Sequence, residues 1–173
     1  IFLFATAIIT AIVSLATGSS WSTIATIGIA LLGIGQALGF PTGLIGGAII
    51  SGAYFGDKMS PLSDTTNLAA AMAGTDLFIH IKYMMYTTIP SFLITLLIFF
   101  FIGIYSDIST DQNIDTLLST VENKFNINLW LFLVPLTVVI MIIKKTPAIP
   151  ALLAGTILGG LFAIIFQPQI ILE

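Results

Sequence analysis

The sequence of 173 residues has no cysteine and no arginine, and only 8% of its residues are charged. Without cysteine the chain has neither a disulfide framework nor a thiolate metal site. Without arginine it has no guanidinium group to clamp a phosphate or carboxylate substrate, and five lysines do not make a basic surface for nucleic acid. The single histidine, His80, argues against a histidine-based metal site. We therefore expect no cofactor and no nucleic-acid partner.

Apolar residues dominate what remains. They make up 57% of the sequence, and the mean hydropathy is +1.11. Soluble domains carry about 25% charged residues, so a soluble core explains this composition poorly. We predict an all-α integral membrane protein, a polytopic helical bundle. Because the chain starts at Ile1 inside an apolar run and without methionine, we expect it to be an internal part of a longer protein.

The first forty residues consist of two apolar arms around a polar turn. The first arm, 1–16, is shorter than the ~20 residues that a helix needs to cross a bilayer. Residues 17–23 are polar, and the second arm, 24–40, is apolar and rich in glycine. We predict a re-entrant hairpin over 1–40, and a pair of full spans joined by a tight turn stays open as the alternative.

A second polar interruption lies within residues 41–75. Pro41 predicts a helix start, and we expect this helix to break at Gly56 and to resume over 63–73. The run SGAYFGDKMSPLSDTTN, residues 51–67, places three charges and several hydroxyls at the break. A charge at membrane depth costs ~2.5–3.5 kcal/mol even on a lenient scale, so such a break requires a bound ligand or a partner. We predict a broken transmembrane helix over 41–75.

Small residues recur every four positions in two places. Ala48, Gly52 and Gly56 share one face of the predicted broken helix, and Gly155 and Gly159 share a face near the end of the chain. Such faces let helix backbones approach each other closely in lipid. We expect both sets to pack against neighbouring helices.

Three further transmembrane helices are predicted, over 76–105, 129–143 and 151–166. A polar, acidic loop at 106–128 separates the first from the second. Cytoplasmic loops carry an excess of lysine, so the pair at 144–145 predicts that this end of the second helix is cytoplasmic and that the acidic loop is outside.

The residues of the two interruptions fit a hard monovalent cation, because they offer carboxylates, hydroxyls and freed carbonyls and no soft ligands. The candidate ligands for Na+ or a proton are Asp64, Asp57, Ser60, Ser63, Thr65, Thr66, Thr17, Ser19 and Ser20. We expect Asp64 to be the central one and the Na+ ligand. Desolvation favours a neutral carboxyl and bound Na+ favours the ionised form, so mutual exclusion at one carboxylate suffices for antiport. Alternatively, Ser60 caps the second half-helix, Pro61 occupies its first turn, and Asp64 only complements the helix dipole.

The roles of the other polar residues stay open at this point. We expect Asp57 and Lys58 to lie in the unwound segment, with Lys58 as the counter-charge to Asp64, or else to be solvated in a vestibule. The hydroxyls of the first interruption either face the second one and lend ligands or belong to a simple turn. These hydroxyls are Thr17, Ser19 and Ser20.

Two runs resemble the NhaC-type Na+/H+ antiporter family, a member of the ion-transporter superfamily. They are ATGSSWSTIATIGIALLGIGQALG (16–39) and GGAIISGAYFGDKMSPLSDTTNLAAAMAGTDLFIHIKYM (46–84). The resemblance implies a multi-pass protein of the bacterial inner membrane, part of an inverted-repeat transporter fold, that exchanges Na+ for H+. Similar proteins exchange malate and protons for lactate and sodium, and this is the first alternative. A non-transporting scaffold or channel component is the second.

The partners that follow are Na+ and H+ as transported ions, the lipid bilayer and the remaining part of the same chain. A homodimer is compatible with this interpretation. An integral-membrane enzyme is the poorest candidate, because the sequence shows no metal-ligand cluster, no nucleophile–histidine arrangement and no phosphate-binding loop.

Overall fold

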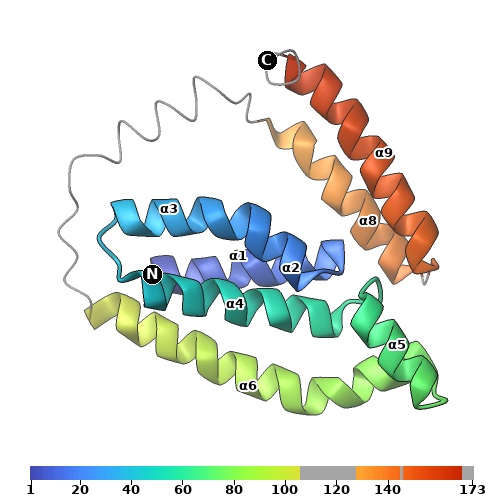
Figure 1. Cartoon of the computed structure of the whole chain (residues 1–173), viewed down its shortest axis with the longest axis horizontal. Coiled ribbons are helices and arrows are strands. Elements are labelled where there is room, and N and C mark those ends of the chain that lie inside the picture. The colour runs from blue at the N-terminus through green and yellow to red at the C-terminus, as the bar shows by residue number, and fades with distance from the viewer. Residues whose placement is uncertain (106–127, 145, 169–173) are drawn as a thin grey trace. The chain divides into compact units, whose positions relative to one another are not determined.

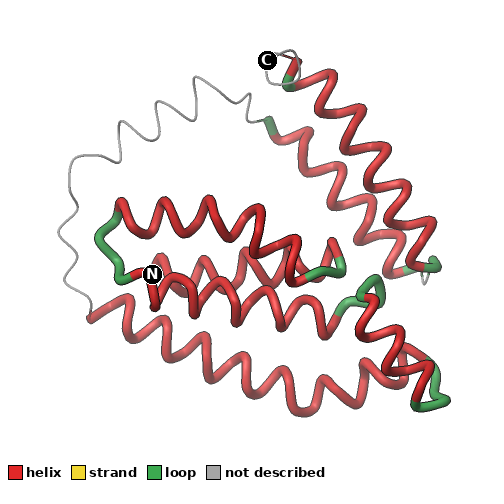
Figure 2. Tube along the Cα trace, in the orientation of Figure 1, coloured by secondary structure: helices red, strands yellow, loops and turns green. Residues whose placement is uncertain are grey.

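A computed structural model describes residues 1–105, 128–144 and 146–168 of the chain, and within these ranges every regular element is a helix. The chain divides into two compact units, one up to Asp111 and one from Gln112. Each unit is described by itself. The prediction of an all-α membrane protein is confirmed for the described part of the chain (Figures 1 and 2).

The described residues of the first unit form seven helical elements. They are α1 (Phe2–Thr17), α2 (Ser20–Thr23), the π-helix η1 (Ile24–Gly28), α3 (Ile29–Ala37), α4 (Thr42–Met59), α5 (Asp64–Met72) and α6 (Leu77–Tyr105). The second unit holds the 3-10 helix η2 (Leu129–Phe132), α8 (Leu133–Ile143) and α9 (Ala148–Phe166).

The first forty residues form a helical hairpin, with α1 as one arm and the run from α2 to α3 as the other (Figure 1). The turn between the arms is shorter than the polar segment suggests, because residues 20–23 are already helical. Gly18 ends α1 with φ +70°, a conformation that glycine adopts without steric penalty. The second arm, Ser20–Ala37, is long and apolar enough to span a membrane, and the first is shorter. That this hairpin enters and leaves the membrane on the same side stays a prediction.

Helices α1 and α4 run parallel and in close contact. A Cβ atom at Gly52 would overlap the carbonyl of Ala7, and one at Gly56 would lie 2.6 Å from the backbone nitrogen of Leu15. Because Gly52 meets Ala7 and Gly56, one turn later, meets Ala11 and Leu15, the two helices point in the same direction and end at the same level. The prediction that Gly52 and Gly56 form a packing face is confirmed.

The core of this unit lies where α6 packs against α1 and α4. Its fully buried side chains include Leu3 and Ile45, and Phe99 of α6 joins them. Stacking of Phe55 on Phe92, with ring centroids 4.1 Å apart, adds a contact between α4 and α6. This packing holds the two parallel helices in a fixed position against the longest helix of the unit.

The break in the second polar segment lies later than predicted. Helix α4 continues through Gly56 and ends at Met59, so the expectation that Asp57 and Lys58 lie in an unwound segment is wrong. Gly56 serves close packing and does not end the helix. Pro61 explains the actual end, because proline disfavours helical backbone at the residue before it, and Ser60 is extended with φ −83° and ψ 126°. The chain resumes as a helix at α5, which Ser63 caps.

Helices α6, α8 and α9 lie at the three predicted segments, but the apolar helix Leu129–Met141 is shorter than a membrane span, so the predicted transmembrane helix over 129–143 stays a prediction. Helix α6 contains Pro90 and is long enough to span a membrane, as is the α9 segment Ile149–Phe166. In the second unit, Val138 of α8 lies 2.8 Å from the position of a Cβ at Gly155, so this small residue also packs a helix pair. Residues 106–127 of the loop predicted at 106–128, and Lys145, lie outside the described residues. The orientation across the membrane stays a prediction.

Candidate cation site at the paired helix breaks

The two breaks of the first unit lie side by side. A Cβ atom at Gly18, between α1 and α2, would lie 2.6 Å from the carbonyl carbon of Leu62, between α4 and α5. The Ser60 hydroxyl donates a hydrogen bond to the carbonyl of Leu15 at 2.7 Å. The parallel course of α1 and α4 therefore brings together two polar segments that are more than forty residues apart in the sequence.

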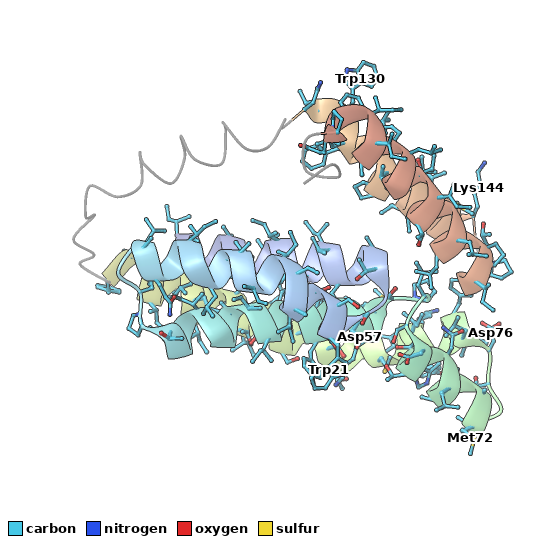
Figure 3. All side chains as sticks on the ribbon, turned by 45° about the horizontal axis from the view of Figure 1, so that its top comes forward. Trp21, Asp57, Met72, Asp76, Trp130 and Lys144 are labelled. Atoms are coloured by element: carbon cyan, nitrogen blue, oxygen red, sulfur yellow. The ribbon has the colours of Figure 1, made fainter. Side chains whose placement is uncertain are left out.

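Asp57 is the buried carboxylate at this meeting point. It lies in the last turn of α4 and is 9% exposed. Its Oδ2 accepts a hydrogen bond of 2.8 Å from the hydroxyl of Ser20, the first residue of α2, whereas its Oδ1 is buried and has no partner among the described residues. Figure 3 labels Asp57 near the start of α2, where Trp21 lies. A buried oxygen without a partner is costly, so a proton or a hard cation on Oδ1 would stabilise this arrangement.

Asp64, the carboxylate expected to be central, has a different environment. It is exposed in the described part of the chain and lies in the first turn of α5, where its Oδ1 accepts from the backbone N–H of Thr65 at 2.8 Å. An acid there complements the helix dipole, as the alternative reading expected. The same alternative expected Ser60 to cap the second half-helix and Pro61 to lie in its first turn. This part is wrong, because Ser63 caps α5, and Ser60 and Pro61 precede the helix. Asp64 as the shared carboxylate stays a prediction.

Lys58 does not meet either carboxylate. It is exposed in the last turn of α4 and forms no ion pair among the described residues. Its role as the counter-charge to Asp64 stays a prediction, and no contact among the described residues supports it.

The hydroxyls of the second break are all engaged by the protein. The Ser60 hydroxyl donates to α1 and also accepts from the N–H of Leu62 at 3.2 Å. Thr66 is buried, and its hydroxyl lies 3.4 Å from the carbonyl of Asp57, so it connects α5 to the end of α4. Ser63 and Thr65 share a hydrogen bond of 2.9 Å at the start of α5. These residues shape the break around Asp57.

The first break contributes one direct contact to the carboxylate. Ser20 binds Asp57, whereas the Ser19 side chain caps α2 by accepting from the N–H of Ser22. The Thr17 hydroxyl lies 3.3 Å from that of Thr23, within its own break. Of the three hydroxyls predicted to face the second break, Ser20 is thus the one that reaches its carboxylate.

Sequence reasoning missed three buried polar residues of α1. Thr6, Thr10 and Ser14 are fully buried on one face of a segment that was expected to be simply apolar. The Ser14 hydroxyl donates to the carbonyl of Ala53 in α4, and that of Thr10 donates to the carbonyl of Thr6 at 2.8 Å. Their spacing of four residues was the available signal, because residues four apart share a helix face.

The part of the chain that contains Asp57 matches a known protein family. The sequence profile of the Na+/H+ antiporter family matches residues 52–173, which include Asp57, the second break and the helices that follow. The chain belongs to the Na+/H+ antiporter family. The resemblance seen in the two sequence runs is thereby confirmed.

Curated relatives agree with this family assignment. The chain is 45% identical over 166 residues to the Na(+)/H(+) antiporter NhaC of Alkalihalophilus pseudofirmus and 43% identical over 169 residues to the Malate-2H(+)/Na(+)-lactate antiporter of Bacillus subtilis. It is 36% identical over 172 residues to the Arginine/ornithine antiporter ArcD of Halobacterium salinarum. Each alignment covers 96% of this chain but only 35–36% of the relative, so the chain spans about a third of their length. No solved structure matches the chain.

Proposed function

We propose that the complete protein is a secondary transporter that exchanges Na+ for H+ across the membrane, and that Asp57 is its shared carboxylate in this part of the chain. Family membership and two NhaC relatives at 44–45% identity support the exchange. The observation that carries the site is the buried Asp57 Oδ1, which has no partner among the described residues although it lies where two helix breaks meet. Family membership and helices that are long and apolar enough to cross a membrane support a membrane transporter.

Alternate binding of H+ and Na+ at Asp57 requires only one carboxylate oxygen, Oδ1. A proton on Oδ1 gives a neutral carboxyl, and Na+ at Oδ1 is bound by the ionised form, so the two ligands exclude each other. The Ser20 hydroxyl keeps its bond to Oδ2 in both cases and holds the carboxylate in one orientation. The helix breaks supply further oxygen ligands in transporters of this kind, as freed carbonyls.

The experiment compares three carboxylates in the complete protein. Inverted vesicles would receive a Na+ gradient, and a pH dye would follow proton movement in Asp57→Asn, Asp64→Asn and Asp76→Asn. Asp76 is the matched control, because it is exposed and its Oδ1 accepts from two backbone N–H groups at the start of α6. We expect Asp57→Asn to abolish exchange and the other two variants to retain it. Full exchange in Asp57→Asn would reject this site, and loss in Asp64→Asn alone would restore the original expectation.

A second candidate function is exchange coupled to an organic acid. The 43% identity to a Malate-2H(+)/Na(+)-lactate antiporter favours it. The absence of arginine from this chain argues against an acid-binding site within these residues. Proton movement that requires added malate or lactate would identify this branch. No Na+-driven proton movement in the wild type, together with cation binding that every carboxylate variant retains, would favour a non-transporting scaffold or channel component.

The remaining expectations concern the setting of the transporter. We propose that the protein resides in the bacterial inner membrane, with Na+, H+, lipid and the rest of its own chain as partners, and that it functions as a homodimer. Relatives from Bacillus subtilis and Alkalihalophilus pseudofirmus support the bacterial membrane.

A further inference from the structure

Two serines, Ser14 in α1 and Ser60 directly after α4, form hydrogen bonds in opposite directions on either side of Asp57. We infer that Ser14 and Ser60 are positioning residues, which hold the Asp57 carboxylate against Ser20 and so set its affinity for Na+. This inference rests on the proposed function of Asp57. It assigns Ser60 a role other than that of a cation ligand, and it gives Ser14 a role that the sequence did not suggest.

The first bond runs from α1 to α4. Ser14 is fully buried, and its hydroxyl donates to the carbonyl of Ala53. Ala53 precedes Asp57 by four residues, so its carbonyl is the group with which an α-helix pairs the Asp57 N–H. The Ser14 hydroxyl therefore links α1 to α4 at a carbonyl one helical turn before Asp57.

The second bond runs from Ser60, the residue that follows α4, back to α1. Ser60, three residues after Asp57 and fully buried, donates to the carbonyl of Leu15 at 2.7 Å and accepts from the N–H of Leu62 at 3.2 Å. Its single proton is thus used for the bond between the helices. Leu15 follows Ser14 directly, so the two bonds form one clamp that brackets Asp57 along α4.

Close packing makes the clamp rigid. Between the two bonds lies Gly56, where a Cβ would be 2.6 Å from the Leu15 nitrogen and 2.7 Å from the Ser14 Cβ. Ser20 follows the end of α1 by only a short turn at Gly18. The position of α1 on α4 therefore decides whether the Ser20 hydroxyl stays 2.8 Å from Asp57 Oδ2. Loss of either clamp bond would therefore weaken the hydrogen bond that orients the Asp57 carboxylate.

The alternative is that these hydroxyls merely pack two helices. A packing role predicts less folded protein with an unchanged dependence on Na+. A positioning role predicts a changed dependence on Na+ in the protein that does fold. Thr10 provides the matched control, because it is buried on the same face of α1 but its hydroxyl donates within its own helix.

The test uses the complete protein, purified in detergent, and measures its thermal unfolding over a series of NaCl concentrations. The same variants, reconstituted in liposomes, give the half-saturating Na+ concentration and the maximal rate of exchange. We expect Ser14→Ala and Ser60→Ala each to raise the Na+ midpoint roughly two- to tenfold, the range that loss of one hydrogen bond gives, with the maximal rate per folded protein retained. Thr10→Val should leave the midpoint unchanged. Ser14→Cys keeps a weak hydrogen-bond donor, so its Na+ midpoint should lie between those of the wild type and Ser14→Ala. It replaces Ser14→Ala in the test if the alanine variant does not fold.

Asp57→Asn, measured in parallel, separates this inference from the proposed function. Loss of the Na+ response in Asp57→Asn with an unchanged midpoint in both serine variants would overturn the clamp and keep the site. An unchanged response in Asp57→Asn would overturn the site. If the serine variants raised the midpoint in that case, the clamp would act through another residue, and the inference would be overturned as well.

Discussion

The contact between α1 and α4 makes a sharp prediction for Gly56→Ala. The new Cβ would lie 2.6 Å from the Leu15 nitrogen and closer still to the Ala11 carbonyl, both of them backbone atoms that cannot rotate away. An ordinary contact begins at 3.4 Å, so α1 would have to retreat by about 0.8 Å to clear the Leu15 nitrogen and by more to clear the Ala11 carbonyl. Overpacking of this kind costs about 1–3 kcal/mol, of which the better helix propensity of alanine returns at most ~1 kcal/mol. We expect a net destabilisation of about 1–2 kcal/mol.

Gly46→Ala is the matched control for this substitution. Gly46 lies in the same helix, and apart from its chain neighbours and the backbone of its own helix no described atom lies within 4 Å of its would-be Cβ. The same change should therefore be neutral or slightly stabilising there. The assay is thermal unfolding of the complete protein in detergent, followed by fluorescence of its native tryptophans. Equal unfolding temperatures for the two variants would refute the close parallel packing on which the site depends.

Three further predictions concern the two breaks, and thermal unfolding of the complete protein checks each of them. Gly18→Ala should destabilise by more than Gly74→Ala, because both glycines have positive φ but only at Gly18 would the new Cβ also overlap Leu62; equal effects would argue against contact between the breaks. Ser63→Ala removes the cap of α5 and should cost about 1 kcal/mol, whereas Ser63→Thr, which keeps a capping hydroxyl, should cost less. Asn67→Ala should cost about 1–2 kcal/mol, because its side-chain amide donates to two carbonyls of the break at 2.7 and 2.8 Å, and a neutral effect would show that water replaces it.

The helices and their packing face could be predicted from the sequence because both depend on local patterns. Long apolar runs indicate spans, and the four-residue spacing of Ala48, Gly52 and Gly56 indicates a face for close approach. The end of α4 was misplaced because glycine is ambiguous in such a helix. At Gly56 its small size serves packing, and the proline at 61 decides where the helix ends.

The choice between the two carboxylates could not be predicted, because burial depends on which neighbouring helix covers each residue. Asp57 is covered because α1 runs parallel to α4 and carries Ser20 onto it, and neither fact is visible in the run around Asp57 itself. Asp64, seven residues later, lies beyond the break and is exposed in the described residues. Ser14 was missed because a serine in an apolar helix usually satisfies its own helix, and its four-residue spacing from Thr10 and Thr6 was overlooked.

Proton release on Na+ binding tests the central claim most directly. The complete protein in weakly buffered detergent solution would receive NaCl, with choline chloride as the ionic control, while a pH dye records released protons. If Asp57 binds Na+ and H+ in turn, wild type and Asp64→Asn release protons on addition of Na+, and Asp57→Asn releases none. Undiminished release from Asp57→Asn would contradict the assignment of Asp57 as the shared carboxylate.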